Sequence, residues 1–129
     1  MNRVVVLDGS VILAVIHQER GFEKVTANLL ARAIISTVNL AEVQSKLVSS
    51  GWSPKEAWED ATSLVQDVLP FTAGHVHVVG NLIMETRSFG LSLADRACLA
   101  LGLDLKAPVY TADRSWKNLK LDLQVHVIR

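Results

Sequence analysis

The sequence has one cysteine, no excess charge of either sign and no long apolar run. Cys98 cannot form an intramolecular disulfide by itself, which is typical of proteins in a reducing compartment. The 13 Lys and Arg balance the 13 Asp and Glu, so RNA binding needs a local basic patch or a bound cation. The apolar run at residues 4–7 is too short for a signal peptide or a membrane span. We therefore expect a cytoplasmic protein that does not bind membranes.

The chain has 129 residues, half of them apolar, which fits a single domain over residues 1–129 with one core. β-branched and apolar runs predict strands that alternate with stretches of helical spacing. This alternation predicts an α/β domain with a mostly parallel central sheet. We expect strands at residues 3–7, 33–37, 108–111 and 124–128, and helices or helical turns at residues 11–17, 22–32, 39–49, 54–68, 74–89, 92–101 and 113–118.

The clearest helix start is at Ser53, where a capping residue is followed by Pro54 and by Glu56 three positions after the cap. We expect this helix to continue to about residue 68, because Pro70 then ends it. Its apolar residues would form one buried side: Trp58, Ala61, Val65 and Val68.

Four acids stand where strands are expected to end and helices to begin. Asp8 and Asp113 follow strands, and Glu42 lies in the first turn of a helix that follows a strand. Asp95 is the third residue of a helix capped by Ser92. Taken singly, each acid is explained as a cap or as a partner of the helix dipole. Together, three of them are directed to the carboxyl edge of a parallel sheet, where ligands bind.

Four carboxylates in one place require compensation. Either some of them take up protons, or a divalent cation holds them together. A set of oxygen ligands without a cysteine or histidine cluster favours Mg²⁺ or Mn²⁺. Such a cation can orient a water molecule, lower the pKa of that water and neutralise phosphate oxygens during an in-line displacement.

Four segments give these acids characteristic neighbours: VVLDGS at residues 5–10, VNLAEV at 38–43, LSLADRACLA at 91–100 and YTADRSW at 110–116. In this order and spacing, over nearly the whole chain, they resemble the motifs of PIN-domain ribonucleases. The resemblance is closest to VapC-type toxins of toxin–antitoxin pairs. It implies a PIN-like α/β/α sandwich, Mg²⁺- or Mn²⁺-dependent cleavage of RNA to 5′-phosphate products, a homodimer, and inhibition by a cognate antitoxin.

The resemblance also assigns roles to residues. Asp8, Asp95 and Asp113 match the metal ligands, and Glu42 matches an acid that either ligates the metal or helps to deprotonate the attacking water. These four are the predicted catalytic residues. Supporting roles fall to Ser10, Thr111 and Asn39. Gly9 departs from the family pattern, because many members have threonine there.

Other polar residues have weaker claims. Arg96, Arg114 and Lys117 lie next to site acids or one turn beyond them, and could contact RNA phosphates. Solvated charges and ion pairs explain them equally well. We interpret His75 and His77 as structural, because nothing completes a metal set with them, and Cys98 as a small core residue. Asp104 is given no role in the site.

Two alternatives remain open from the sequence. One is a phosphatase-like or receiver-like α/β domain, but Ser10 stands where the phosphatase pattern requires a second acid, and the acidic pair and late lysine of receivers are not evident. The other is a PIN-like module that binds a partner without catalysis. That module is expected to lack a site acid, and none is missing here.

Overall fold

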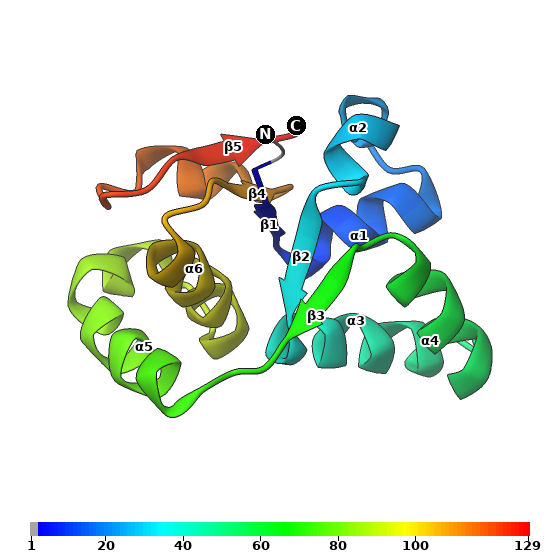
Figure 1. Ribbon diagram of the computed structural model, residues 1–129, viewed down its shortest axis with the longest axis horizontal. Helices are drawn as coiled ribbons and strands as arrows, with labels where there is room; N and C mark the ends of the chain where they lie inside the picture. The colour runs from blue at the N-terminus through cyan, green and yellow to red at the C-terminus, as the bar shows by residue number, and fades with distance from the viewer. Residues whose placement is uncertain (1–2) are drawn as a thin grey trace.

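The computed structural model describes residues 3–129, and its strands form one sheet in the order β3-β2-β1-β4-β5 (Figure 1). Every pair of neighbouring strands is parallel. The predicted α/β class with a mostly parallel sheet is therefore confirmed. The strands are β1 (Val5–Leu7), β2 (Ala33–Ser36), β3 (Asp67–Leu69), β4 (Val109–Thr111) and β5 (Val125–Val127).

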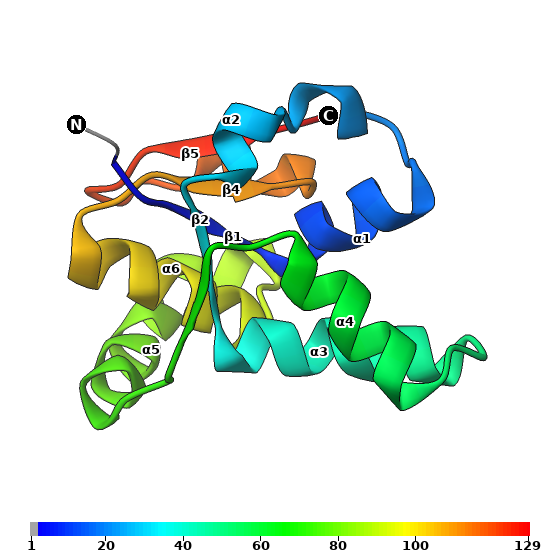
Figure 2. The same cartoon turned by 45° about the vertical axis from the view of Figure 1, so that its right-hand side comes forward.

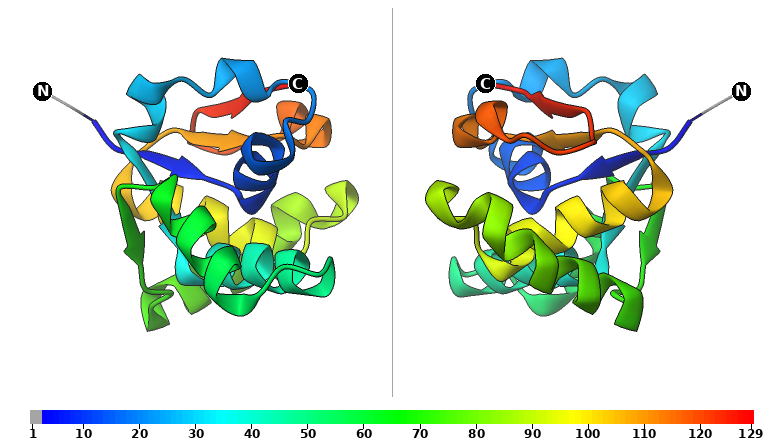
Figure 3. Two further views of the ribbon diagram at one scale, coloured as in Figure 1. Left: turned by 90° about the vertical axis from the view of Figure 1, so that its right-hand side faces the viewer. Right: turned by 90° about the vertical axis from the view of Figure 1, so that its left-hand side faces the viewer.

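Helices cover both faces of this sheet (Figures 2 and 3). Side chains from α1, α2, α3 and α4 form a core on one face, and side chains from α5, α6 and η3 form a core on the other. The α/β/α sandwich is thus present. The helical elements are α1 (Gly9–His17), η1 (Phe22–Lys24), α2 (Ala27–Leu30), α3 (Thr37–Ser49), α4 (Pro54–Ser63), α5 (Ala73–Thr86), η2 (Arg87–Phe89), α6 (Leu93–Leu105) and η3 (Arg114–Asn118).

The strands at the centre of the sheet are continuous apolar runs in the sequence. In β1, Val5 and Leu7 pack into the core under α1 and α3, whereas Val6 packs into the core under α6. Successive side chains of a strand point to opposite faces, so a sheet covered on both sides needs an apolar residue at every position. All three residues of β1 are accordingly buried.

One predicted helix is shorter than expected. The helix that begins at Pro54 ends at Ser63, and residues 67–69 are the edge strand β3. The backbone of this segment pairs with β2, with Val68 opposite Ile35, and this pairing outweighs the helical spacing of the valines. Trp58 was expected to be buried but is 54% exposed. The helix packs instead through the small residues Ala57 and Ala61.

The helix predicted at residues 22–32 is also wrong, because it is two short pieces. The first, η1, ends at Lys24, and α2 begins only at Ala27. Thr26 separates them, since its hydroxyl accepts the backbone N–H of Leu29 at 3.1 Å and so starts a new helix.

None of the helices within residues 3–129 is long and apolar enough to cross a membrane.

The strand order determines where a ligand site can form. From β1 the chain moves to β2 on one side, while β4 lies on the other side of β1. The order reverses between β1 and β4, so the connections that leave these two strands diverge. A crevice at the carboxyl edge is expected at such a reversal. The segments that begin at Asp8 and at Ala112 leave the sheet there.

Candidate active site

A cleft of about 750 Å³ opens at this edge of the sheet, and all four predicted acids line it. The acids come from four separate segments: the end of β1, the first half of α3, the first turn of α6 and the turn after β4. The tertiary structure therefore gathers residues that are distant in the sequence. The remaining lining residues are Ser10, Leu13, Glu19, Arg20, Lys46, Ser92, Ala112, Arg114 and Arg129.

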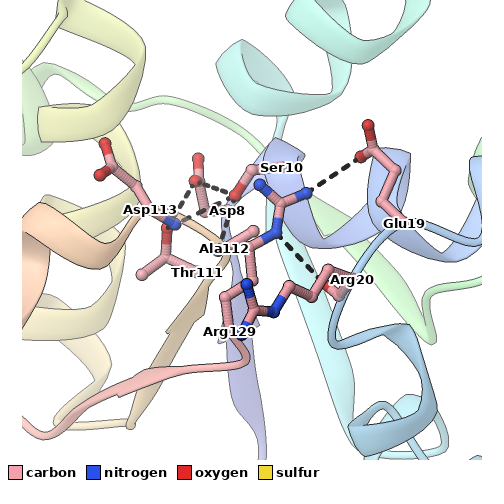
Figure 4. A network of polar contacts seen from close by, with 8 residues as sticks. All are labelled: Asp8, Ser10, Glu19, Arg20, Thr111, Ala112, Asp113 and Arg129. Atoms are coloured by element: carbon pink, nitrogen blue, oxygen red, sulfur yellow. Dashed lines mark hydrogen bonds and ion pairs between the residues drawn. The ribbon is translucent and has the colours of Figure 1, made fainter.

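Asp8 is the most buried of the four acids, with only 4% of its surface exposed. Two hydroxyls donate to its Oδ2 atom: Ser10 Oγ at 2.6 Å and Thr111 Oγ1 at 2.9 Å (Figure 4). Its other oxygen, Oδ1, receives no hydrogen bond from the described part of the chain. The carboxylate is thus oriented by one oxygen, while the other keeps its full capacity as a ligand.

The two hydroxyls are themselves held by the backbone that follows β4. Ser10 Oγ accepts the N–H of Ala112 at 2.9 Å, and Thr111 Oγ1 accepts the N–H of Asp113 at 3.1 Å. Each hydroxyl oxygen therefore already accepts a backbone hydrogen, which leaves its own hydrogen for Asp8. This arrangement ties the end of β1 to the end of β4, directly at the point where the strand order reverses.

The electrostatics of the site are unfavourable to an ionised Asp8. Burial is the largest cause, and together with the charges of Asp95 and Glu42 it raises the pKa of Asp8 from 3.8 to about 6. The hydrogen bonds from Ser10 and Thr111 act in the opposite direction but do not outweigh it. No cationic side chain among residues 3–129 contributes to lowering this pKa.

A buried amide holds α3 and α6 together at the cleft. Asn39 Nδ2 donates to the carbonyl oxygen of Ala94 at 2.9 Å, and Asn39 is fully buried. Glu42 lies one turn further along α3, and Asp95 is the residue next to Ala94. Asn39 therefore joins the two helices that carry Glu42 and Asp95.

The capping box predicted at the start of α6 is present. Asp95 Oδ2 accepts the N–H of Ser92 at 2.9 Å, and the N–H of Asp95 donates to Ser92 Oγ at 3.1 Å. Asp113 has a comparable local role in η3, where its Oδ1 accepts the N–H and the hydroxyl of Ser115 at 2.9 and 2.8 Å. Both acids thus use one oxygen as a cap, as the analysis of single residues predicted, and both still line the cleft.

The small size of Gly9 lets α1 start directly against α3. A Cβ atom at this position would lie 3.0 Å from Val43 Cγ2, 3.3 Å from the Asn39 carbonyl oxygen and 3.7 Å from Glu42 Oε1. The close approach brings Glu42 beside the end of β1. Gly9, which departs from the pattern of the resemblance, therefore leaves room for this close approach of α1 to α3.

The residues with weaker claims divide between the cleft and other places. Arg114 lines the cleft, whereas Lys117 does not. Arg96 Nη1 donates to the carbonyl oxygen of Val79 on α5 at 2.9 Å, which directs its guanidinium away from the acids. Glu19, Arg20, Lys46 and Arg129 also line the cleft. Sequence reasoning missed all four. Lys46 could have been found, because it lies four residues after Glu42 on the same helix. No motif marks the other three, whose place depends on how the loop after α1 meets the segment after β5.

His75 and Cys98 have structural surroundings. Thr72 and His75 form the capping box of α5, and His75 Nε2 lies 3.0 Å from Asp104 Oδ2 at the end of α6. Asp104 thus has a structural partner at a distance from the cleft acids. Cys98 is fully buried, and burial, followed by the charges of Asp8 and Asp95, raises the pKa of its thiol well above the ordinary value. A thiol of this kind is not a nucleophile.

The donor set fits a hard divalent cation. The donors are carboxylate oxygens, the preferred ligands of Mg²⁺ and Mn²⁺, and no cationic side chain among residues 3–129 lowers the pKa of Asp8. Within residues 3–129, no three acidic, histidine or cysteine side chains already converge as a metal cluster. Asp95 and Asp113 each turn one oxygen towards backbone N–H groups. Each carboxylate retains a second oxygen that is not used in its cap.

Comparison with known proteins gives one family and a set of similar folds. The model of the PIN domain family matches residues 5–121. No curated protein sequence matches the chain.

Among solved structures, VapBC2 from Rickettsia felis, bound to a DNA fragment from its promoter, is similar with a TM-score of 0.70 and 21% identity, over 95% of this chain and 96% of that one. DNA-bound VapBC from Salmonella typhimurium gives a TM-score of 0.73 at 14% identity, over 98% and 99% of the two chains. VapBC-1 from nontypeable Haemophilus influenzae gives 0.70 at 17% identity, over 97% and 98%. At these identities the likeness establishes a shared fold.

Proposed function

The chain belongs to the PIN domain family, and we propose that it is an Mg²⁺- or Mn²⁺-dependent endoribonuclease that hydrolyses RNA phosphodiester bonds with water. One observation carries the proposal: four carboxylates from four separate segments line one cleft. The buried Asp8 in this cleft has a raised pKa, and no cationic side chain among residues 3–129 lowers it. A cluster of this kind suits a cation and a phosphate more than any neutral substrate.

Each residue of the site has a separate role in this proposal. Asp8, Asp95 and Asp113 hold the metal directly or through water, and Ser10 and Thr111 keep the carboxylate of Asp8 in place. When bound, the cation lowers the pKa of a water molecule and neutralises phosphate oxygens. Glu42 either adds a ligand or accepts a proton from the attacking water. In this proposal water attacks the phosphorus and the bond to the ribose O3′ breaks, so the products carry a 5′-phosphate and a 3′-hydroxyl.

We further propose that the protein is the toxin of a type II toxin–antitoxin pair. The support is the similarity of the fold to the VapBC structures, over nearly the full length of both chains. In this proposal the chain works in the cytoplasm as a homodimer, and a cognate antitoxin inhibits it. A brief pulse of expression followed by sequencing of the cleaved cellular RNA identifies the target, and co-expression of the cognate antitoxin should abolish the cleavage.

The activity is tested with purified protein, RNA and Mg²⁺ or Mn²⁺. We expect cleavage with either cation, none with EDTA, and a fall of at least about 100-fold in the Asp8→Asn variant, because the best-held ligand is lost. The circular dichroism spectrum of that variant should be unchanged. Asp122→Asn is the matched control, because Asp122 is exposed and lies outside the cleft. Full activity in Asp8→Asn, or cleavage in EDTA, contradicts the proposal.

A non-catalytic, partner-binding module is the alternative of another class. Calorimetric titration with Mn²⁺ separates the two. A nuclease should bind the cation, with affinity reduced about 10- to 100-fold in Asp95→Asn, by analogy with the loss of a group that supports a metal site. A parent protein that binds no Mn²⁺ favours the non-catalytic module.

A further inference from the structure

Cationic side chains stand at the rim of the cleft that the acids occupy. Arg20 and Arg129 belong to one wall, where the loop after α1 meets the segment after β5. We propose that Arg129 is a substrate-binding residue whose guanidinium holds a phosphate of the RNA strand next to the bond that is cut. The inference rests on the proposed nuclease function and names a residue that the sequence motifs do not include.

The backbone places Arg129 with little freedom. The segment after β5 continues the pairing with β4, because the N–H of Ile128 donates to the Thr111 carbonyl oxygen at 2.9 Å. The Ile128 side chain is buried in the core, with 3% of its surface exposed. Arg129 therefore directly follows Ile128, which is buried and bonded to Thr111, the residue whose hydroxyl donates to Asp8.

The loop after α1 closes on the same segment from the other side (Figure 2). Gly21 has a φ of +93°, and a Cβ atom at this position would lie 2.2 Å from the Ile128 carbonyl oxygen. Only glycine fits this conformation and this approach. The contact brings Glu19 and Arg20 beside Arg129.

Two hydrogen bonds then orient the guanidinium itself. Arg129 Nε donates to the Arg20 carbonyl oxygen at 3.1 Å, and Nη2 donates to Glu19 Oε1 at 3.4 Å (Figure 4). Its Nη1 group makes no hydrogen bond to any described residue. A guanidinium held by one edge presents the other edge to a ligand and loses little entropy when it binds.

The hydrogen bonds of Arg129 go to the Glu19 carboxylate and the Arg20 carbonyl oxygen, and none goes to Asp8, Glu42, Asp95 or Asp113. Arg129 is therefore not a direct ion-pair partner of these four acids. Its side chain remains 32% exposed at the cleft, where a planar fork of donors matches two oxygens of a phosphate. Because the net charge of the chain is zero, such local cations are what binds the RNA backbone.

The test measures binding of a fluorescein-labelled single-stranded RNA to the cleavage-deficient Asp8→Asn protein by fluorescence anisotropy. Salt is varied from about 50 to about 200 mM, and the slope of log K against log salt is compared between variants. Adding Arg129→Gln should weaken binding about tenfold and reduce the slope by about 0.7, the value for one phosphate contact to a single strand. Arg129→Lys should retain the slope and recover part of the affinity.

Arg3→Gln is the matched control, because Arg3 is exposed, precedes β1 and lies at the opposite end of the sheet. It should leave both quantities unchanged. In the otherwise wild-type protein, Arg129→Gln should raise KM about tenfold with kcat changed less than about threefold, as expected for a contact made equally to substrate and transition state.

The outcomes separate the two proposals. If the parent protein cleaves RNA and Arg129→Gln leaves affinity, slope and KM unchanged, the assignment of Arg129 is overturned and the nuclease function stands. A loss confined to kcat also overturns it. If Arg129→Gln leaves RNA binding intact but abolishes binding of a protein partner, the guanidinium serves a partner carboxylate instead. If the parent neither binds nor cleaves RNA, both proposals fall.

Discussion

At the scale of the residue, the buried Asp8 lowers the stability of the folded protein when it is ionised. Its pKa of about 6 in the folded protein lies above the ordinary value of 3.8. The folded state therefore binds this proton more tightly than the unfolded state does. This proton stabilises the folded state. Its contribution to the free energy of unfolding is complete below about pH 4 and is lost as the pH rises to about 6. Above that pH, the ionised Asp8 lowers the free energy of unfolding by about 3 kcal/mol.

This linkage predicts that Asp8→Asn stabilises the metal-free protein. At about pH 8 in EDTA, the free energy of unfolding should rise by roughly 1–3 kcal/mol, because the neutral amide avoids the buried charge and still accepts from both hydroxyls. Urea denaturation at several pH values measures it, and the difference should shrink below about pH 6. Asp122→Asn should show no such trend. A variant less stable than the parent at about pH 8 contradicts the burial argument.

At the scale of the element, the site depends on how α3 and α6 are joined. The hydrogen bond from Asn39 to the Ala94 carbonyl oxygen is the buried polar link between the two helix starts. The charges of Glu42 on α3 and Asp95 on α6 both raise the pKa of Asp8. A polar link of fixed length holds the two helices at one separation, which an apolar contact specifies less closely.

Replacing the link is expected to affect metal binding more than stability. Asn39→Ala should lower the free energy of unfolding by roughly 1–2 kcal/mol and weaken Mn²⁺ binding about tenfold or more, because Glu42 and Asp95 are no longer held at a fixed separation. Gln44→Ala is the control on the same helix, since its amide donates to the Pro54 carbonyl oxygen at 3.0 Å and does not line the cleft. Equal losses of Mn²⁺ affinity in the two variants would show that the link has no special role.

At the scale of the whole molecule, the reversal of strand order creates the cleft, and the four acids give it a negative charge. A divalent cation that binds this cleft binds the folded state only, because the four segments separate on unfolding. The protein should therefore be stabilised by the cation through mass action, by about 2.7 kcal/mol at a concentration 100 times the Kd.

We expect Mn²⁺ to raise the Tm at about pH 8 and to raise it much less at about pH 5, where Asp8 holds a proton that the metal must displace. Differential scanning calorimetry with and without Mn²⁺ measures both shifts. Asp8→Asn should abolish the shift at the higher pH, whereas Asp122→Asn should keep it. A Tm shift of the same size at both pH values would mean that Mn²⁺ binds elsewhere.

The sequence alone determined the elements whose signals are local. Caps at Ser53 and Ser92 and the apolar run before Asp8 depend on near neighbours, so propensity and periodicity reveal them. The helix that carries Glu42 was predicted to begin at Asn39, but it begins at Thr37 after the cap Ser36, so Glu42 lies beyond its first turn. The same local motifs marked the acids and predicted the parallel sheet. Where a signal was ambiguous, the prediction failed: the valines at 65 and 68 have helical spacing, yet Val68 belongs to an edge strand paired with β2.

Only the tertiary structure decided which side chains share the cleft. Arg129 reaches the cleft because Ile128 pairs with β4 and because Gly21 leaves room for the Ile128 carbonyl oxygen. Gly21 and Ile128 are more than 100 residues apart in the sequence. Arg96 is directed to α5 although it follows Asp95 directly. The raised pKa of Asp8 likewise arises from burial and from charges on α3 and α6. Such properties depend on distances in space, which local sequence patterns do not encode.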